Sequence, residues 1–143
     1  MKIALGCDHG AYDLKEAIKK HLEANGHTVK DFGCFDKSSC DYPDFAGAAA
    51  KAVAAGECER GIVCCTTGIG VSITANKVRG VRCALCADCF SAEATRQHND
   101  ANVLALGARV TGPGLAVKIT DVFLDTPFSN DERHIRRIAK IED

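Results

Sequence analysis

The fold is decided by residues 61–70, GIVCCTTGIG, where a continuous apolar run meets a turn that contains glycine. Residues 61–65 are short and apolar throughout, which is typical of a parallel strand buried on both faces. The turn at residues 66–70 leads into a helical pattern that continues to about Lys77. The stretch therefore predicts one βα unit.

The same unit recurs along the whole chain. Five such units in series predict a single-domain α/β fold, a doubly wound (Rossmann-like) three-layer sandwich with a five-stranded parallel sheet and a C-terminal helix. Asn130 is the expected N-cap of that last helix. The predicted strands are 2–7, 27–32, 61–65, 81–87 and 103–106. The predicted helices are 12–25, 44–55, the segment after the 66–70 turn up to about Lys77, 91–98, 114–124 and 131–141. A loop is expected at 33–43.

Composition narrows the class of protein. A length of 143 residues suits one domain, 1–143. Eighteen basic against nineteen acidic side chains give a net charge of −1, which argues against a nucleic-acid partner. No apolar run is long enough to span a membrane, and the N-terminus lacks a signal-peptide profile. Nine cysteines, an odd number, predict reduced thiols in a cytoplasmic protein.

In a doubly wound fold, ligands bind beyond the carboxyl ends of the strands. The first strand ends in Asp8 and His9 beside Gly10. An acid and an imidazole at this place could move protons on a bound ligand. The alternative is that Asp8 caps the next helix and His9 is merely exposed.

The third strand ends in Cys64 and Cys65, whose side chains are expected to face opposite sides of the sheet. Gly68 and Gly70 precede a helix, so backbone N–H groups there could converge on an anion. The thiolate of Cys65 would face the positive end of that helix. The alternative is two core thiols and a tight turn.

Two further groups have both a chemical and a structural interpretation. His98 lies near a helix C-terminus, where it is either a capping cation or a proton donor. Arg133 and Arg137 are four residues apart, so they could grip one phosphate or simply form a solvated basic face. Cys83 and Cys86 have metal-ligand spacing, but an odd separation within a strand puts them on opposite faces. No metal site is therefore predicted.

Together these residues resemble the type B ribose-5-phosphate isomerase family, which also contains galactose-6-phosphate isomerase subunits. The match covers nearly the whole chain. It is carried by GCDHGAYDLK (6–15), DYPDFA (41–46), CTTGIGVSITANK (65–77), RQHNDANVLALGARV (96–110) and the pair Arg133 and Arg137.

The resemblance implies a role for each matching residue. Cys65 would be the base that moves a proton between C2 and C1 of an open-chain sugar phosphate. His98 would be the ring-opening acid with Asp8 nearby, and Thr67 would help to orient the sugar oxygens. The N–H groups of residues 66–70 would stabilise the enediolate, and the implied substrate-binding residues are His9, Thr66, Gly68, Ile69, Gly70, Asn99, Arg109, Arg133 and Arg137.

Proteins similar to this one need no metal or organic cofactor. They are homodimers, sometimes paired into tetramers, with sites built at the subunit interface. The resemblance thus implies that the helix at 131–141 packs on the partner subunit.

Thr66 departs from the family, because most members have glycine after the catalytic cysteine. A β-branched residue there adds bulk beside the reacting carbons. The expected substrate is D-ribose 5-phosphate, and galactose 6-phosphate, allose 6-phosphate or a tetrose phosphate are alternatives. A non-catalytic module that binds a phosphometabolite, or a cysteine-based redox or metal protein, also fits the pattern.

Overall fold

The computed structural model describes residues 1–143 and contains one sheet of five parallel strands in the order β2-β1-β3-β5-β4. The predicted fold class is confirmed. Cys7 pairs with Cys64 and Cys65 pairs with Gly107, so the inner strands end at the same edge of the sheet. The strands are β1 (Lys2–Cys7), β2 (Thr28–Asp31), β3 (Arg60–Cys65), β4 (Cys83–Leu85) and β5 (Val103–Gly107).

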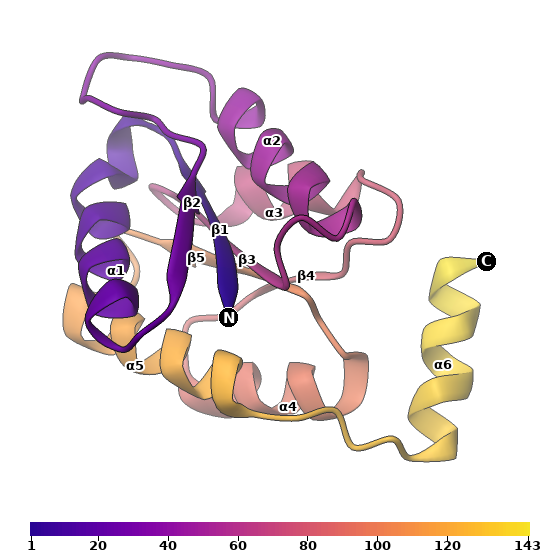
Figure 1. Cartoon of the computed structure of the whole chain (residues 1–143). Coiled ribbons are helices and arrows are strands. Elements are labelled where there is room, and N and C mark those ends of the chain that lie inside the picture. The colour runs from indigo at the N-terminus through magenta and orange to yellow at the C-terminus, as the bar shows by residue number, and fades with distance from the viewer.

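Helices cover both faces of the sheet (Figure 1). One core contains apolar residues of α1, α4 and α5, and the other contains those of α2 and α3. A one-turn 3-10 helix, η1 (His9–Ala11), follows β1. The helices are α1 (Tyr12–Ala24), α2 (Tyr42–Ala54), α3 (Ile69–Asn76), α4 (Cys89–Asn99), α5 (Pro113–Asp125) and α6 (Glu132–Glu142). No helix combines the length and the apolar character that crossing a bilayer requires.

Several predicted boundaries were wrong. β4 keeps only three of the seven expected residues, because it is an edge strand that pairs with β5 alone. α2 begins at Tyr42, since Pro43 is tolerated in a first helical turn. The N-cap of α6 is Asp131 and not Asn130: the Asp131 side chain accepts the N–H of Arg133, while Asn130 has a φ of 57°.

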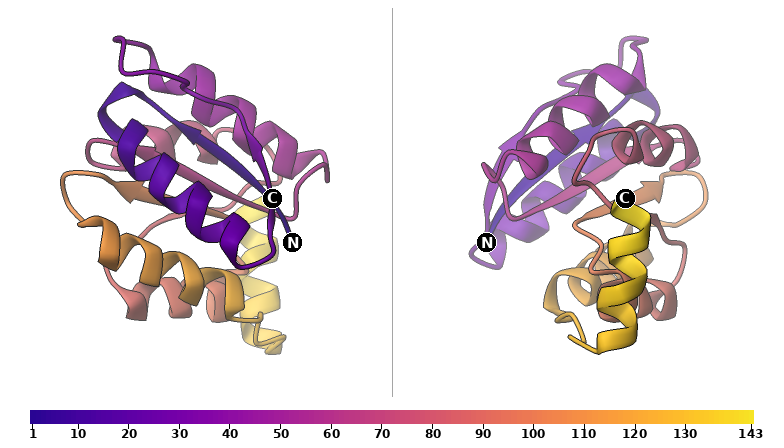
Figure 2. Two further views of the ribbon diagram at one scale, coloured as in Figure 1. Left: turned by 60° about the vertical axis from the view of Figure 1, so that its left-hand side comes forward. Right: turned by 90° about the vertical axis from the view of Figure 1, so that its right-hand side faces the viewer.

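The last helix stands away from the sheet (Figures 1 and 2). α6 packs on α4, and His134 is its only buried residue. Ile135 and Ile141 are 50% and 63% exposed. The helix therefore leaves part of its apolar surface uncovered within one chain.

Candidate active site

Cys65 ends β3 and lies in the turn that opens α3. Its Sγ accepts the N–H of Gly68 at 3.1 Å, and the residue is only 5% exposed. Gly68 has a φ of 80°, and a side chain there would come within 3.0 Å of the Leu106 and Gly107 backbone. The turn thus fixes the sulfur beside the N-terminal end of α3.

Cys64 and Cys65 face opposite sides of the sheet, as predicted. Cys64 belongs to the core beneath α1 and α5, and Cys65 to the core beneath α2 and α3. Burial raises the pKa of the Cys64 thiol, so it stays protonated. Of the two, only Cys65 lines a pocket.

That pocket has a volume of about 430 Å³ and opens at the carboxyl edge of the sheet. Asp8 lies in it, with its carboxylate accepting the N–H of Gly10 at 3.0 Å. Asp8 therefore caps η1, as the structural interpretation expected, and still faces the pocket. The lining residues are Asp8, Tyr42, Cys65, Thr66, Thr67, Ile69, Gly70 and Ile73.

The predicted row of N–H groups is partly occupied. The N–H of Gly68 is donated to the Cys65 sulfur, and that of Ile69 to the Thr67 hydroxyl at 3.2 Å. These bonds hold the turn in shape. Only the N–H groups that the turn does not use internally remain for a ligand oxygen.

Two side chains set the width of the pocket. Thr66 fills the space beside Gly10, because a side chain on Gly10 would meet the Thr66 Oγ1 at 2.5 Å. The Tyr42 ring lies over Gly70, where an added Cβ would be 2.6 Å from it. Tyr42 was not among the predicted site residues, although it lies in the DYPDFA segment and before a proline.

His9 and Arg109 flank this pocket at the same edge. The ring Nδ1 of His9 accepts the N–H of Cys40 at 3.2 Å. The Arg109 N–H is donated to the Thr66 carbonyl at 3.0 Å. The Arg109 side chain lines a neighbouring cavity of about 340 Å³ that it shares with Gly10.

The other predicted residues gather in a separate pocket of about 390 Å³ between α4 and α6. His98, Asn99, Arg133 and Arg137 all line it. His134 was not among the predicted site residues, although it lies between the two arginines; its ring centroid is 4.6 Å from that of His98. Ser129 bonds His134 at 2.8 Å. Burial and the nearby His98 lower the pKa of His134, because a second positive charge there would be repelled.

The two pockets lie at opposite edges of the sheet. α4 runs back from the carboxyl edge, so His98 near its end is close to where the strands begin. Asn102, just beyond that helix, accepts the N–H of Gly61 at the start of β3. A six-residue strand is about 20 Å long. Asp8 and His98 are therefore far apart within one chain, and the expectation that His98 acts near Asp8 stays a prediction that needs a second chain.

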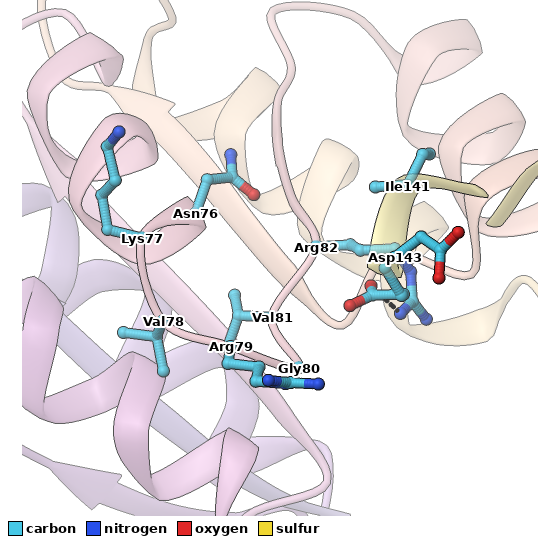
Figure 3. Close-up of a pocket in the computed structure, with 10 residues that line it drawn as sticks. Asn76, Lys77, Val78, Arg79, Gly80, Val81, Arg82, Ile141 and Asp143 are labelled. Carbon is cyan, nitrogen blue, oxygen red and sulfur yellow. Dashed lines mark hydrogen bonds and ion pairs between the residues drawn. The ribbon is translucent and has the colours of Figure 1, made fainter. Parts of the chain in front are cut away.

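The largest cavity, about 560 Å³, contains none of the predicted site residues. It lies between the loop after α3 and the end of α6, as Figure 3 shows. Arg82 bonds Glu142 across it at 2.7 Å and so holds the end of α6. Ile141 also lines the His98 pocket, so this residue of α6 borders both cavities.

Comparison with known proteins matches residues 3–141 to the Ribose/Galactose Isomerase family. The putative sugar phosphate isomerase YwlF of Bacillus subtilis is 50% identical over 100% of this chain and 96% of its own. Ribose-5-phosphate isomerase B of Escherichia coli is 46% identical over 98% and 93%. The structure of Clostridium thermocellum ribose-5-phosphate isomerase B superposes with a TM-score of 0.97 at 51% identity, covering 99% of this chain and 95% of that one.

Relatives named for other sugars match as well. The galactose-6-phosphate isomerase subunit LacB of Clostridium acetobutylicum is 42% identical over 100% of this chain and 83% of its own. The D-erythrulose-4-phosphate isomerase of Pectobacterium atrosepticum is 46% identical over 90% and 85%. The names of these relatives agree on sugar-phosphate isomerisation and differ in the sugar.

Proposed function

The chain belongs to the ribose/galactose isomerase family, and we propose that it interconverts D-ribose 5-phosphate and D-ribulose 5-phosphate in the cytoplasm at a site shared by two copies of the chain. An aldose–ketose isomerase of this family acts on a sugar phosphate. The observation that carries the proposal is the Cys65 sulfur, held by the Gly68 N–H and facing a pocket that also contains Asp8.

Cys65 acts as the base in this proposal. Its thiolate takes the proton from C2 of the open-chain aldose, the hydroxyl proton passes from O2 to O1, and the thiol, whose proton can exchange with solvent, then protonates C1 and is a thiolate again. The intermediate is a cis-enediolate, and the N–H groups left free in the 66–70 turn stabilise its negative charge. Asp8 and Thr67 orient the sugar oxygens. A module that only binds a phosphometabolite would need no thiol fixed at this point.

A second chain completes the site. His98, Asn99, Arg133 and Arg137 lie at the edge opposite Cys65 in their own chain. In a two-fold dimer, the carboxyl edge of one chain can meet the α6 side of the other, and symmetry then repeats the contact. His98 of the partner subunit would open the sugar ring, and the two arginines would bind the phosphate. The same contact would cover the exposed apolar surface of α6.

The choice of ribose 5-phosphate follows the names of the relatives and structures, most of which are ribose-5-phosphate isomerases. Thr66 favours a second candidate, a different sugar phosphate, because its side chain narrows the pocket beside Gly10. Galactose 6-phosphate, allose 6-phosphate and a tetrose phosphate are therefore part of the test.

The first experiment measures proton exchange from D₂O into ribose 5-phosphate, erythrulose 4-phosphate, galactose 6-phosphate and allose 6-phosphate. We expect ribose 5-phosphate to exchange with the highest kcat/KM. A higher value for another sugar phosphate would overturn the assignment of ribose 5-phosphate as the substrate. Cys65→Ala should abolish exchange while sugar-phosphate binding persists, since the thiolate acts on the transition state. Cys64→Ala is the matched control and should remain active; exchange that survives in Cys65→Ala would refute the assigned base.

The second experiment tests the shared site. Two inactive variants, Cys65→Ala and Arg137→Ala, are mixed under conditions in which subunits exchange. One of the two sites in a mixed dimer then receives both substitutions and the other receives none, so activity should recover to nearly half of the wild-type value per mixed dimer. No recovery despite proven exchange would mean that each chain completes its own site.

A further inference from the structure

Two cysteines outside the proposed catalytic set meet directly next to Asp8. Cys7 ends β1, and Cys34 lies in the loop between β2 and α2. Their Sγ atoms are 3.8 Å apart, and both residues are buried, with 0% and 4% exposure. The proposed reaction uses neither sulfur.

The backbone holds the two residues side by side. The Cys7 N–H is donated to the Gly33 carbonyl at 2.6 Å, and the Cys34 N–H to the Cys7 carbonyl at 2.9 Å. The buried Lys15 Nζ bonds the Cys34 carbonyl at 2.6 Å and both Asp31 oxygens at 2.9 Å. A disulfide has an S–S distance of about 2.05 Å, so the sulfurs need to approach by about 1.8 Å.

Cys34 is the less enclosed member of the pair, with 4% exposure against 0% for Cys7. The Cys34 thiol donates to the Asp36 carbonyl at 3.2 Å in a part-buried contact. Burial first, and then the neighbouring Cys34, raises the pKa of Cys7, which slows the reaction of the Cys7 thiol with an oxidant in solution. Cys34 is therefore the sulfur that a small oxidant meets first, with Cys7 next to it as the resolving thiol.

We propose that hydrogen peroxide converts Cys7 and Cys34 to a reversible disulfide, and that this bond lowers turnover by displacing Asp8 and the loop that contacts His9. In the first step the Cys34 sulfur attacks one peroxide oxygen, forming a sulfenic acid; the O–O bond breaks and the other oxygen leaves as water with the thiol proton. In the second step the Cys7 sulfur displaces the hydroxyl group, which leaves as water with the Cys7 proton. Two thiols lose two electrons, and one peroxide becomes two waters.

The bond would act on the active site through two short connections. Asp8 directly follows Cys7, and its N–H is donated to the Cys64 carbonyl at 3.3 Å. The loop that carries Cys34 also carries Cys40, whose N–H holds the His9 ring. A misplacement of about 1 Å at a catalytic group can cost about 100-fold in rate. We expect at least a tenfold loss of kcat/KM, an effect that rests on the proposed function, whereas formation of the bond does not.

The test begins with the wild-type protein, treated with hydrogen peroxide, alkylated and digested with trypsin. Cys7 and Cys34 fall in the separate peptides 3–15 and 31–37, while Cys65 lies in 61–77, so a linked pair is assigned by mass. We expect the 3–15 and 31–37 peptides to be linked, with a loss of turnover that dithiothreitol restores. The mapping detects the bond even if the substrate has been assigned wrongly.

Cys34→Ser separates this bond from oxidation of Cys65 itself, because it removes one sulfur and keeps a hydroxyl donor. We expect it to form no linked peptide and to lose activity in peroxide several-fold more slowly than the wild type. Cys58→Ser is the matched control: Cys58 is 3% exposed and lies in the opposite core, so this variant should behave like the wild type.

Three results would overturn the proposal. Wild-type protein without the 3–15 to 31–37 link would exclude the bond, and this result needs no variant to fold. Equal inactivation rates for Cys34→Ser and the wild type would assign the loss to another thiol. A linked protein with unchanged turnover would exclude any effect on the site.

Discussion

Gly68→Ala probes the geometry that places the Cys65 sulfur. Gly68 has a φ of 80°, and an added Cβ would lie 2.5 Å from Leu85 Cδ1, 2.9 Å from the Leu106 carbonyl carbon and 3.0 Å from the Gly107 nitrogen. The leucine side chain can move, but the β5 backbone at Leu106 and Gly107 is held by its pairing with β3. The turn itself must therefore shift.

The expected cost has two parts. An alanine in the left-handed region costs roughly 1–2 kcal/mol relative to glycine. Forcing a methyl group into a packed region costs about 1–3 kcal/mol more. We therefore expect the free energy of unfolding to fall by about 2–5 kcal/mol. Because the Gly68 N–H holds the Cys65 sulfur at 3.1 Å, a shift of the turn by about 1 Å would also lower kcat by about 100-fold.

Denaturant unfolding, followed by circular dichroism at one protein concentration, measures the first effect, and steady-state isomerisation measures the second. Gly114→Ala is the matched control, since Gly114 lies in α5 with nothing within 4 Å of an added Cβ; it should be neutral or slightly stabilised. If Gly68→Ala unfolds at the same denaturant concentration as Gly114→Ala and keeps wild-type kcat, the role given to this turn is refuted.

Three further substitutions test other parts of the site. Thr66→Gly widens the pocket beside Gly10, so the kcat/KM ratio between ribose 5-phosphate and its longer or shorter relatives should change about tenfold; an unchanged ranking would show that Thr66 is neutral. His98→Asn should slow turnover of the cyclic sugar more than that of an open-chain analogue, and equal losses would assign His98 to binding. Burial and His98 hold the pKa of His134 below its ordinary value near 6.5, so the unfolded chain binds more protons and His134 reduces stability as the pH falls below about 6.5. His134→Gln should therefore flatten the loss of stability between pH 7 and 5, and a slope equal to that of the wild type would contradict this.

The fold could be predicted because each inner strand is a continuous apolar run, and each is followed by a segment whose apolar residues recur at helical spacing. Because adjacent residues of a strand face opposite sides of the sheet, the sequence also predicted that Cys64 and Cys65 lie on different faces. The same reasoning placed Cys83 and Cys86 on opposite faces, and the two residues pack in different cores. The boundaries were less accurate where tertiary pairing decides them: β4 ends where β5 stops pairing with it.

The positions of the predicted site residues could be predicted where they follow from strand ends, but contacts across the pockets could not. Asp8, Cys65 and Thr67 share a pocket because they follow strands that end at one edge. Tyr42 and His134 were missed because their roles depend on what lies across from them, Gly70 and His98, and neither contact has a signature in local spacing. The Cys7–Cys34 contact was missed for the same reason, since it joins residues 27 positions apart.

The separation of the two pockets follows from the topology and not from a detail of side-chain packing. In a parallel βα fold every helix returns toward the edge where the strands begin, so a residue at a helix C-terminus, such as His98, is carried away from the strand ends that hold Cys65. No loop movement of ordinary size closes a gap of about 20 Å across a sheet that is buried in the core. A chain that uses both residues in one reaction must therefore bring in the second residue from another copy. Assembly then becomes a condition of catalysis, and the uncovered apolar side of α6 is the surface that such an assembly would bury.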